Sequence, residues 1–189
     1  MATYFSDNYT DVSAGSLVST LPTITQVNDS SKAGRLRYKR SEIRVQSGFD
    51  PASEAEIFRM GTFKSSDRLI AAYISTSVAA GNNTQVNIGA YLSGSNHDGA
   101  VIDADCFATD IELNAVIART EYLAGDDAAT DPEEIGLPLW QQVSLSAAGS
   151  YTADPGVDFD IALTTDDTTH GAYSAAQIIV CEFYYHSGD

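Results

Sequence analysis

The chain has 189 residues, a formal net charge of −16 at pH 7 and 43% hydrophobic residues. This length suits one domain that buries a core without disulfide or metal staples, and the hydrophobic content argues against general disorder. The negative charge repels nucleic acid and anionic membrane, and no stretch approaches the ~18–20 apolar residues of a membrane-spanning helix. We therefore expect neither nucleic acid nor membrane as a partner.

Residues 1–34 are rich in Ser, Thr, Asn and Asp, with scattered aromatic and β-branched residues that follow no sustained period. A disordered tail usually carries fewer such residues. The composition predicts an extended N-terminal arm that docks on the chain's own body or on a neighbour, followed by one β-sandwich domain at 35–189. The first residues lack the basic region and apolar core of a signal peptide, which predicts synthesis in a cytoplasm.

After the arm, short apolar runs are separated by turn signals, which is typical of an all-β sandwich or jelly roll. Residues 68–74 are almost continuously apolar, as in a strand buried on both faces, and the turn residues after them predict that 68–92 form a β-hairpin. The segment 103–123 fits a strand or a helix face, with a helical turn near 105–110. Further strands are expected at 36–45, 57–63, 86–92, 137–145, 158–163 and 176–185.

Basic residues are concentrated in one part of the chain. Six of the ten fall in residues 32–44, whereas residues 69–189 carry one basic residue against eighteen acids. Alternation along the first expected strand places its odd-numbered basic residues on one face, opposite Leu36 and Tyr38. These cations either pair with the protein's own acidic loops or meet acidic groups of a partner. The second interpretation predicts a contact surface that also uses aromatic residues of the arm: Tyr4, Phe5, Tyr9, Arg35, Arg37 and Lys39.

No pattern of catalytic residues is present. His97, His170 and His186 lie in polar loops or the tail and belong to no metal-ligand or nucleophile motif, so we interpret them as surface histidines. Cys106 and Cys181 lie in apolar contexts, which predicts buried, reduced thiols. We expect no catalytic residue, no enzymatic activity and no cofactor.

Two other features have a functional and a structural interpretation. Trp140 can stack on a sugar ring, but a core position is commoner for a tryptophan. Clustered carboxylates are candidate calcium ligands, but none follows a calcium-loop pattern, so we interpret them as solvated acids and expect no metal site. Asp158 and Asp160 also fit the solvent-exposed face of a strand. The candidate clusters are Asp103 with Asp105, Asp126 with Asp127 and Asp131, and Asp158 with Asp160.

Several short stretches, taken in order, resemble a known family. They are Met1-Ala-Thr-Tyr-Phe-Ser-Asp-Asn-Tyr-Thr10, Ile57-Phe-Arg-Met-Gly-Thr-Phe63, Ser66-Asp-Arg-Leu-Ile-Ala-Ala-Tyr73, Val86-Asn-Ile-Gly-Ala-Tyr91, Asp103-Ala-Asp-Cys-Phe-Ala-Thr109, Leu137-Pro-Leu-Trp140, Ala153-Asp-Pro-Gly156 and the Tyr-rich final strand. Their order and spacing are similar to those of small virion structural proteins of tailed bacteriophages. The basic stretch 32–44 has no counterpart in that pattern.

This resemblance implies a capsid decoration (cement) protein. Such a protein binds the major capsid protein, is β-rich, forms a homotrimer and resides in the virion after synthesis in the host bacterial cytoplasm. A tail, neck or receptor-binding β-sandwich module of a virion is the alternative that the resemblance leaves open.

Overall fold

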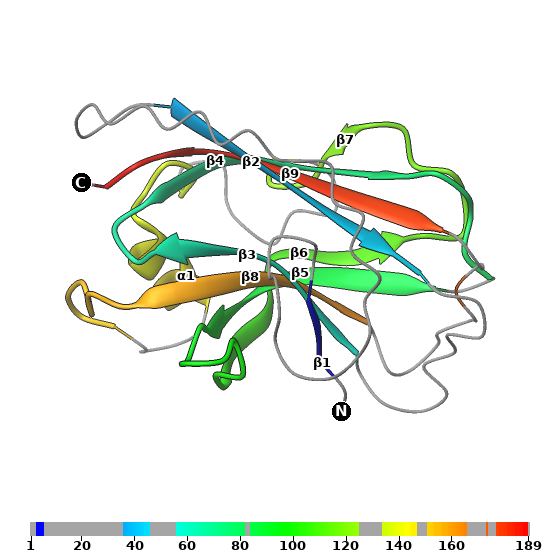
Figure 1. Ribbon diagram of the computed structural model, residues 1–189. Coiled ribbons are helices and arrows are strands. Elements are labelled where there is room, and N and C mark those ends of the chain that lie inside the picture. Colours follow the sequence, from blue (N-terminus) through cyan, green and yellow to red (C-terminus); the bar gives the residue numbers. More distant parts are fainter. Residues whose placement is uncertain are drawn as a thin grey trace.

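Two stacked β-sheets form the protein (Figure 1). The structure, a computed structural model, describes residues 3–5, 36–45, 56–81, 84–124, 134–146, 151–165, 173 and 177–188. The elements in chain order are β1 (Thr3–Phe5), β2 (Leu36–Arg44), β3 (Ile57–Lys64), β4 (Arg68–Thr76), β5 (Gln85–Leu92), β6 (Val101–Glu112), β7 (Thr120–Glu121), α1 (Leu139–Ser146), β8 (Asp158–Thr165) and β9 (Ile178–His186).

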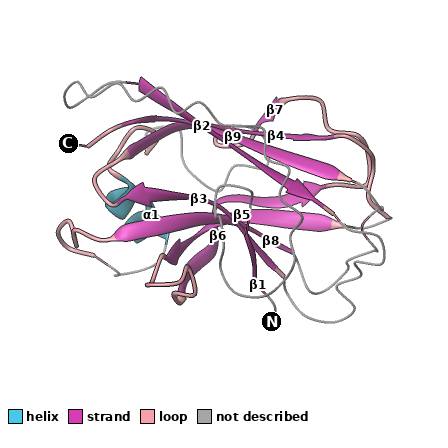
Figure 2. Ribbon diagram, in the orientation of Figure 1, coloured by secondary structure: helices cyan, strands magenta, loops and turns pink. Residues whose placement is uncertain are grey.

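Sheet A has the strand order β1-β3-β8-β5-β6, and sheet B has the order β2-β9-β4-β7. All neighbouring strands are antiparallel except β1, which pairs in parallel with β3 from Thr3↔Ile57 to Phe5↔Arg59. Figure 2 shows how little helix accompanies these strands. The predicted all-β sandwich is confirmed. The backbone pairing of β1 places the start of the chain on its own body, whereas the predicted domain boundary at 34/35 lies outside the described residues.

The core lies between the two sheets and is made by inward-facing residues of both. Phe63 of sheet A meets two rings of sheet B edge-on, Phe183 at 5.4 Å and Tyr185 at 5.1 Å between ring centroids. Met60 and Leu69 are fully buried beside them. Each such side chain contributes about 1.5–3 kcal/mol by leaving water, so this interior holds the two layers together.

The predicted hairpin at 68–92 is wrong, because its two strands belong to different layers. β4 pairs with β9 in sheet B, and β5 pairs with β8 and β6 in sheet A. The chain therefore changes sheet between β4 and β5, and Ala80 N, after the end of β4, donates to Leu113 O. β4 is also buried mainly on one side: Leu69, Ala72 and Ile74 face the core, and the residues between them are half-buried.

The expected strand at 137–145 is instead the helix α1. Pro138 stands just before it, where a missing N–H costs nothing, and its carbonyl accepts bonds from Gln141 N and Gln142 N. Leu139 and Val143, four residues apart, share the buried side of the helix. The helical turn expected near 105–110 is likewise absent, because that segment lies inside β6.

Candidate functional site

The predicted contact residues fall in different environments. Tyr4 and Phe5 belong to β1, of which the structure describes the backbone alone, and Tyr9 and Arg35 lie outside the described residues. Arg37 and Lys39 belong to β2. A shared contact surface for all six residues therefore stays a prediction, and the strand β2 supplies the part of it that can be described.

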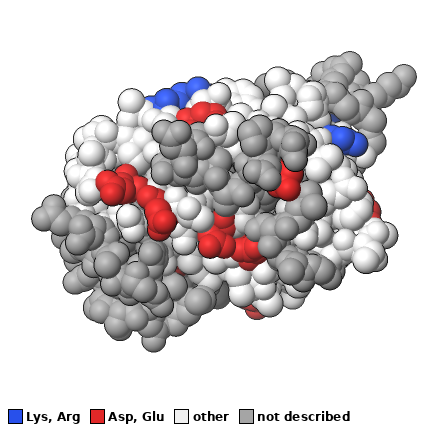
Figure 3. Space-filling model, turned by 180° about the vertical axis from the view of Figure 1, so that it is seen from behind, with Lys and Arg blue, Asp and Glu red and all other residues white. Residues whose placement is uncertain are grey.

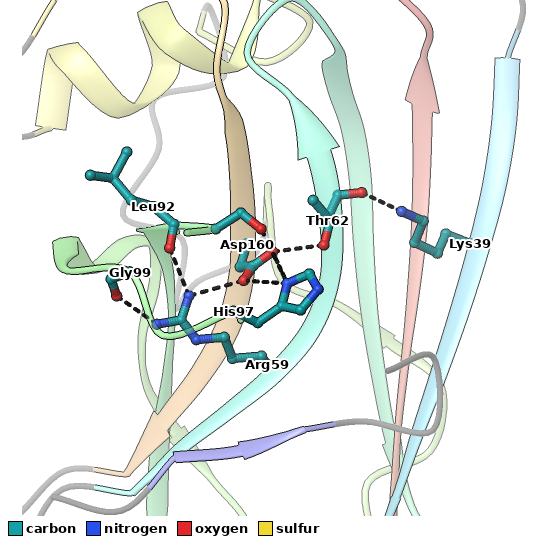
Figure 4. Close-up of polar contacts among 8 residues, drawn as sticks. Lys39, Arg59, Thr62, Leu92, His97, Gly99 and Asp160 are labelled. Carbon is teal, nitrogen blue, oxygen red and sulfur yellow. Dashed lines mark hydrogen bonds and ion pairs between the residues drawn. The ribbon is translucent and has the colours of Figure 1, made fainter. Parts of the chain in front are cut away.

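Lys39 points into the sandwich rather than away from it. Its amine donates to Thr62 O of sheet A and lies 4.3 Å from the centroid of the Phe63 ring (Figure 4). Burial lowers the pKa of Lys39, an effect opposed by the charges of Asp67, Asp160 and Asp158. The expected arrangement, with apolar residues of β2 inside and its odd-numbered cations outside, is reversed at this end of the strand.

The physical reason is strict alternation along β2. This strand pairs with β9 from Leu36↔His186 to Arg44↔Ile178 without a register shift. Because Ile43 is in the core, every odd-numbered residue of the strand points inward and every even-numbered one outward. Leu36 and Tyr38 consequently remain 59% and 48% exposed.

Three tyrosines from three strands meet on the outer surface of sheet B. Tyr184 of β9 lies between Tyr38 of β2, at 5.1 Å between ring centroids, and Tyr73 of β4, at 5.9 Å. Neighbouring exposed side chains and two glutamates complete this surface. We call the set the tyrosine face: Leu36, Tyr38, Arg40, Glu42, Arg44, Tyr73, Arg119, Glu182 and Tyr184.

Glu182 organises the centre of the tyrosine face. Its carboxylate accepts a 2.6 Å hydrogen bond from Tyr38 Oη and another from Arg119 Nε. The Arg119 guanidinium lies 3.7 Å from the Tyr73 ring centroid and donates to Tyr184 Oη at 3.2 Å. These contacts hold long side chains in one arrangement on an exposed sheet.

Two pKa shifts follow from this network. Partial burial disfavours the Glu182 carboxylate, but the hydrogen bonds from Tyr38 and Arg119 and the charge of Arg119 outweigh it and lower the pKa of Glu182. Burial, followed by the hydrogen bond to Glu182 and its charge, raises the pKa of Tyr38 to about 12. The face therefore keeps one phenol and one carboxylate in fixed ionisation states across neutral pH.

Charge is divided between the layers. Among the exposed or half-exposed cations that the structure describes, Arg40, Arg44 and Arg119 lie on the tyrosine face and Arg68 at the start of β4, whereas Lys64 lies at the end of β3 in sheet A. The opposite layer carries acids, above all Asp103, Asp105, Asp110 and Glu112 along β6. Figure 3, seen from behind, shows Asp and Glu across the middle of the surface and the visible Lys and Arg towards the margin where sheet B lies.

A second polar cluster is buried on the side of sheet A that faces away from sheet B (Figure 4). Arg59 and Asp160 form an ion pair of 3.0 Å, Thr62 Oγ1 donates to Asp160 at 2.7 Å, and His97 Nδ1 lies 3.1 Å from the same carboxylate. The prediction that Asp160 lies on the solvent-exposed face of its strand is wrong, because its side chain is fully buried. His97 is a half-buried partner of Asp160 rather than a plain surface histidine.

Arg59 links this cluster to the loop between β5 and β6. It donates to Leu92 O at 2.9 Å and to Gly99 O at 2.7 Å, and its guanidinium lies 4.9 Å from the Tyr91 ring centroid. Asp160 and the loop carbonyls thus take up both terminal nitrogens of Arg59. The cluster acts as a cross-link between β3, β8 and this loop.

The candidate calcium ligands are only partly described. Asp105 N donates to Asp103 Oδ1 at 3.3 Å, and a side-chain hydrogen bond to Asp103 raises the pKa of Asp105. Asp126, Asp127 and Asp131 lie outside the described residues. Within the part of the chain that the structure describes, no three His, Cys, Asp or Glu residues gather in a way that suits a metal ion.

Those of the remaining singled-out residues that the structure describes are buried or half-buried. The side chains of Cys106 and Cys181 are both buried, as predicted. Trp140 of α1 packs, partly buried, against the core between the sheets. His186 is half-buried in β9, and His170 lies outside the described residues. Among the described elements no helix is long and apolar enough to cross a membrane.

Sequence reasoning did not find most of the tyrosine face. Tyr73, Glu182 and Tyr184 come together only because β9 lies between β2 and β4. One signal was available for Arg119, which is the single basic residue of 69–189 and therefore stands out among eighteen acids.

No protein-family model and no curated protein sequence matches the chain. Among solved structures, a chain in the capsid of Ralstonia phage GP4 is 10% identical, with a TM-score of 0.52 over 84% of this chain and 88% of its own length. A chain in the capsid asymmetric unit of cyanophage Pam1 is 8% identical, with a TM-score of 0.38 over 83% of this chain and 88% of its own. The sandwich fold is thus similar to that of a chain found in a phage capsid.

Proposed function

We propose that this chain is a structural protein of a bacteriophage capsid, of the decoration (cement) type, and that its partner is the major capsid protein. The observation that carries the proposal is the similarity of its fold, over most of both chains, to a chain in the capsid of Ralstonia phage GP4. The sequence resemblance to phage virion proteins supports the same role independently. In this role the protein resides in the virion and needs no catalytic group or cofactor.

The mechanism is mechanical. Each copy bridges neighbouring shell subunits, and the interface area that it buries adds to the resistance of the shell against internal pressure. A trimer makes three such contacts with the shell at once, so it binds more tightly than a single contact would. The rigid sandwich, with its cross-linked loop at Arg59, suits a part that must bear load without changing shape.

A tail, neck or receptor-binding module is the second candidate. The observation in its favour is the exposed set of tyrosine rings on sheet B, because aromatic side chains on a flat surface also stack on sugar rings. This alternative differs from the first in its position on the particle and in its ligand, a receptor rather than a shell subunit.

Co-sedimentation tests the proposal. The purified chain is mixed with empty shells assembled from the major capsid protein of the same phage and spun through a sucrose cushion. We expect the intact chain to sediment with the shells in a saturable amount. If a chain lacking residues 2–30 sediments with them to the same extent, the arm is not the docking element. If the intact chain does not sediment with shells but binds tail structures, the decoration role is wrong.

A further inference from the structure

We propose that the tyrosine face of one copy docks on strand β6 of a second copy, so that the chain associates head to tail. This inference concerns the self-association that the proposed function expects, but it rests on two surfaces of the chain itself. The two surfaces lie in different layers of the sandwich, so one molecule cannot bring its own pair together (Figure 1). A second molecule can.

The first surface has the composition of an interface core. Leu36 and Tyr38 are two of the few large hydrophobic residues that the described chain exposes. Tyrosine and arginine are the side chains that most often carry binding energy at interfaces, and lysine is depleted there. The network around Glu182 already fixes Tyr38 and Arg119, so their ordering costs little at the moment of binding.

The charge of the tyrosine face is opposite to that of the rest of the molecule. It carries three arginines, Arg40, Arg44 and Arg119, against the glutamates Glu42 and Glu182. The chain as a whole has a charge of −16. Two copies therefore repel one another in most orientations, and the face with excess positive charge is the favoured place of approach.

Strand β6 supplies the complementary surface. Asp105, Asp110 and Glu112 are exposed along it, and Val101 at its start is 55% exposed. The strand forms an edge of sheet A, with β5 as its neighbour on the other side. The exposed acids of β6 complement the arginines of the tyrosine face, and Val101 is an exposed apolar residue on the same strand. A head-to-tail contact of this kind closes into a ring where the rotation permits, and a trimer would be such a ring.

Charge reversal on each surface tests this contact. The variants R44E/R119E and D105K/E112K are compared with the controls K64E/R68E and D98K/D158K. The controls change the net charge equally at positions that belong neither to the nine residues of the tyrosine face nor to β6. Circular dichroism and thermal unfolding check that each variant is folded. Sedimentation velocity at micromolar concentrations and low salt measures association.

We expect the unaltered chain and both controls to associate, and each test variant alone to associate at least tenfold more weakly. An equimolar mixture of the two test variants should recover contacts between unlike copies, because such a contact pairs an intact tyrosine face with an intact β6 or a reversed face with a reversed strand. A ring of three copies always keeps one mismatched contact, so the mixture should recover dimers rather than the closed trimer. Raising the salt concentration should weaken all of these contacts.

Other results overturn the inference in distinguishable ways. If R44E/R119E dissociates while D105K/E112K does not, the tyrosine faces of two copies meet each other. If self-association is unchanged but R44E/R119E alone loses binding to shells, the face docks on the shell. A monomeric unaltered chain excludes the contact. Self-association is measured on the free protein without shells. A free protein that does not self-associate therefore contradicts this contact but not the decoration role, and a chain that does not bind shells contradicts the decoration role but not this contact.

Discussion

Arg59 and Asp160 form an ion pair of 3.0 Å in which the two side chains are 2% and 0% exposed. Removing one partner leaves the other charge buried, so we expect D160N to lower the free energy of unfolding by about 3–5 kcal/mol. The double variant R59M/D160N should lose less, because it removes both charges. Urea unfolding of the three proteins provides the measurement. A D160N protein within about 1 kcal/mol of the unaltered chain would contradict the role of the pair as a cross-link.

Gly89 of β5 allows the backbone of the neighbouring strand β6 to approach at close range. A Cβ atom at this position would lie 2.2 Å from the carbonyl carbon of Ala104, whereas one at Gly61 would lie 2.9 Å from Cδ of the flexible Lys39 side chain. Backbone cannot move aside as a side chain can, so we expect G89A to cost about 3 kcal/mol and G61A about 1 kcal/mol or less. If G89A and G61A lowered the free energy of unfolding equally in chemical denaturation, the close contact between Gly89 and β6 would be contradicted.

Partial burial of Tyr38, together with its hydrogen bond to Glu182, predicts a pH effect on the alkaline side. The pKa of Tyr38 is about 12 in the folded chain and about 10 when unfolded, so the stability that Tyr38 contributes is complete below pH 10 and declines as pH rises towards 12. The variant E182Q removes the negative charge, so the pKa of Tyr38 should fall towards its usual value. Phenolate absorbance, taken as the difference between each protein and its Y38F derivative, follows this titration. An identical Tyr38 titration in both proteins would contradict the network.

The two cysteines are predicted to be unreactive in the folded protein. Burial raises the pKa of the Cys106 thiol and that of Cys181, and reaction with a thiol reagent requires the exposed thiolate. Labelling followed by mass spectrometry should show no modification under native conditions and two modified sites in denaturant. Rapid labelling of either thiol in the folded chain would place it at the surface instead.

The fold class was readable from the sequence, but two local assignments failed for different reasons. The helix α1 was signalled by Pro138 and by the four-residue spacing of Leu139 and Val143, which the apolar run around them obscured. In the apparent hairpin 68–92 both strands are correct, but they belong to different sheets. Nothing in a turn sequence states whether the next strand returns to the same sheet or crosses to the other, because that choice depends on packing.

The reversed face of β2 was predictable in principle. Tyr38 and Ile43 are five residues apart, so they cannot both face the core of a strand without a bulge, and the structure contains none there. Asp160 was not predictable in this way. Alternation assigned it correctly to the side away from Ile161. That side is also covered, since Ala104 of β6 packs there against a small cluster of buried residues. The tyrosine face depends on strand order, which a single sequence does not reveal.

Imaging of the purified phage particle by electron cryomicroscopy tests the central claim most directly. The account predicts density for this sandwich at regular positions over the outside of the head, in symmetric groups whose members touch through sheet B of one copy and β6 of the next. Density confined to the tail or neck, with a bare shell, would contradict the decoration role.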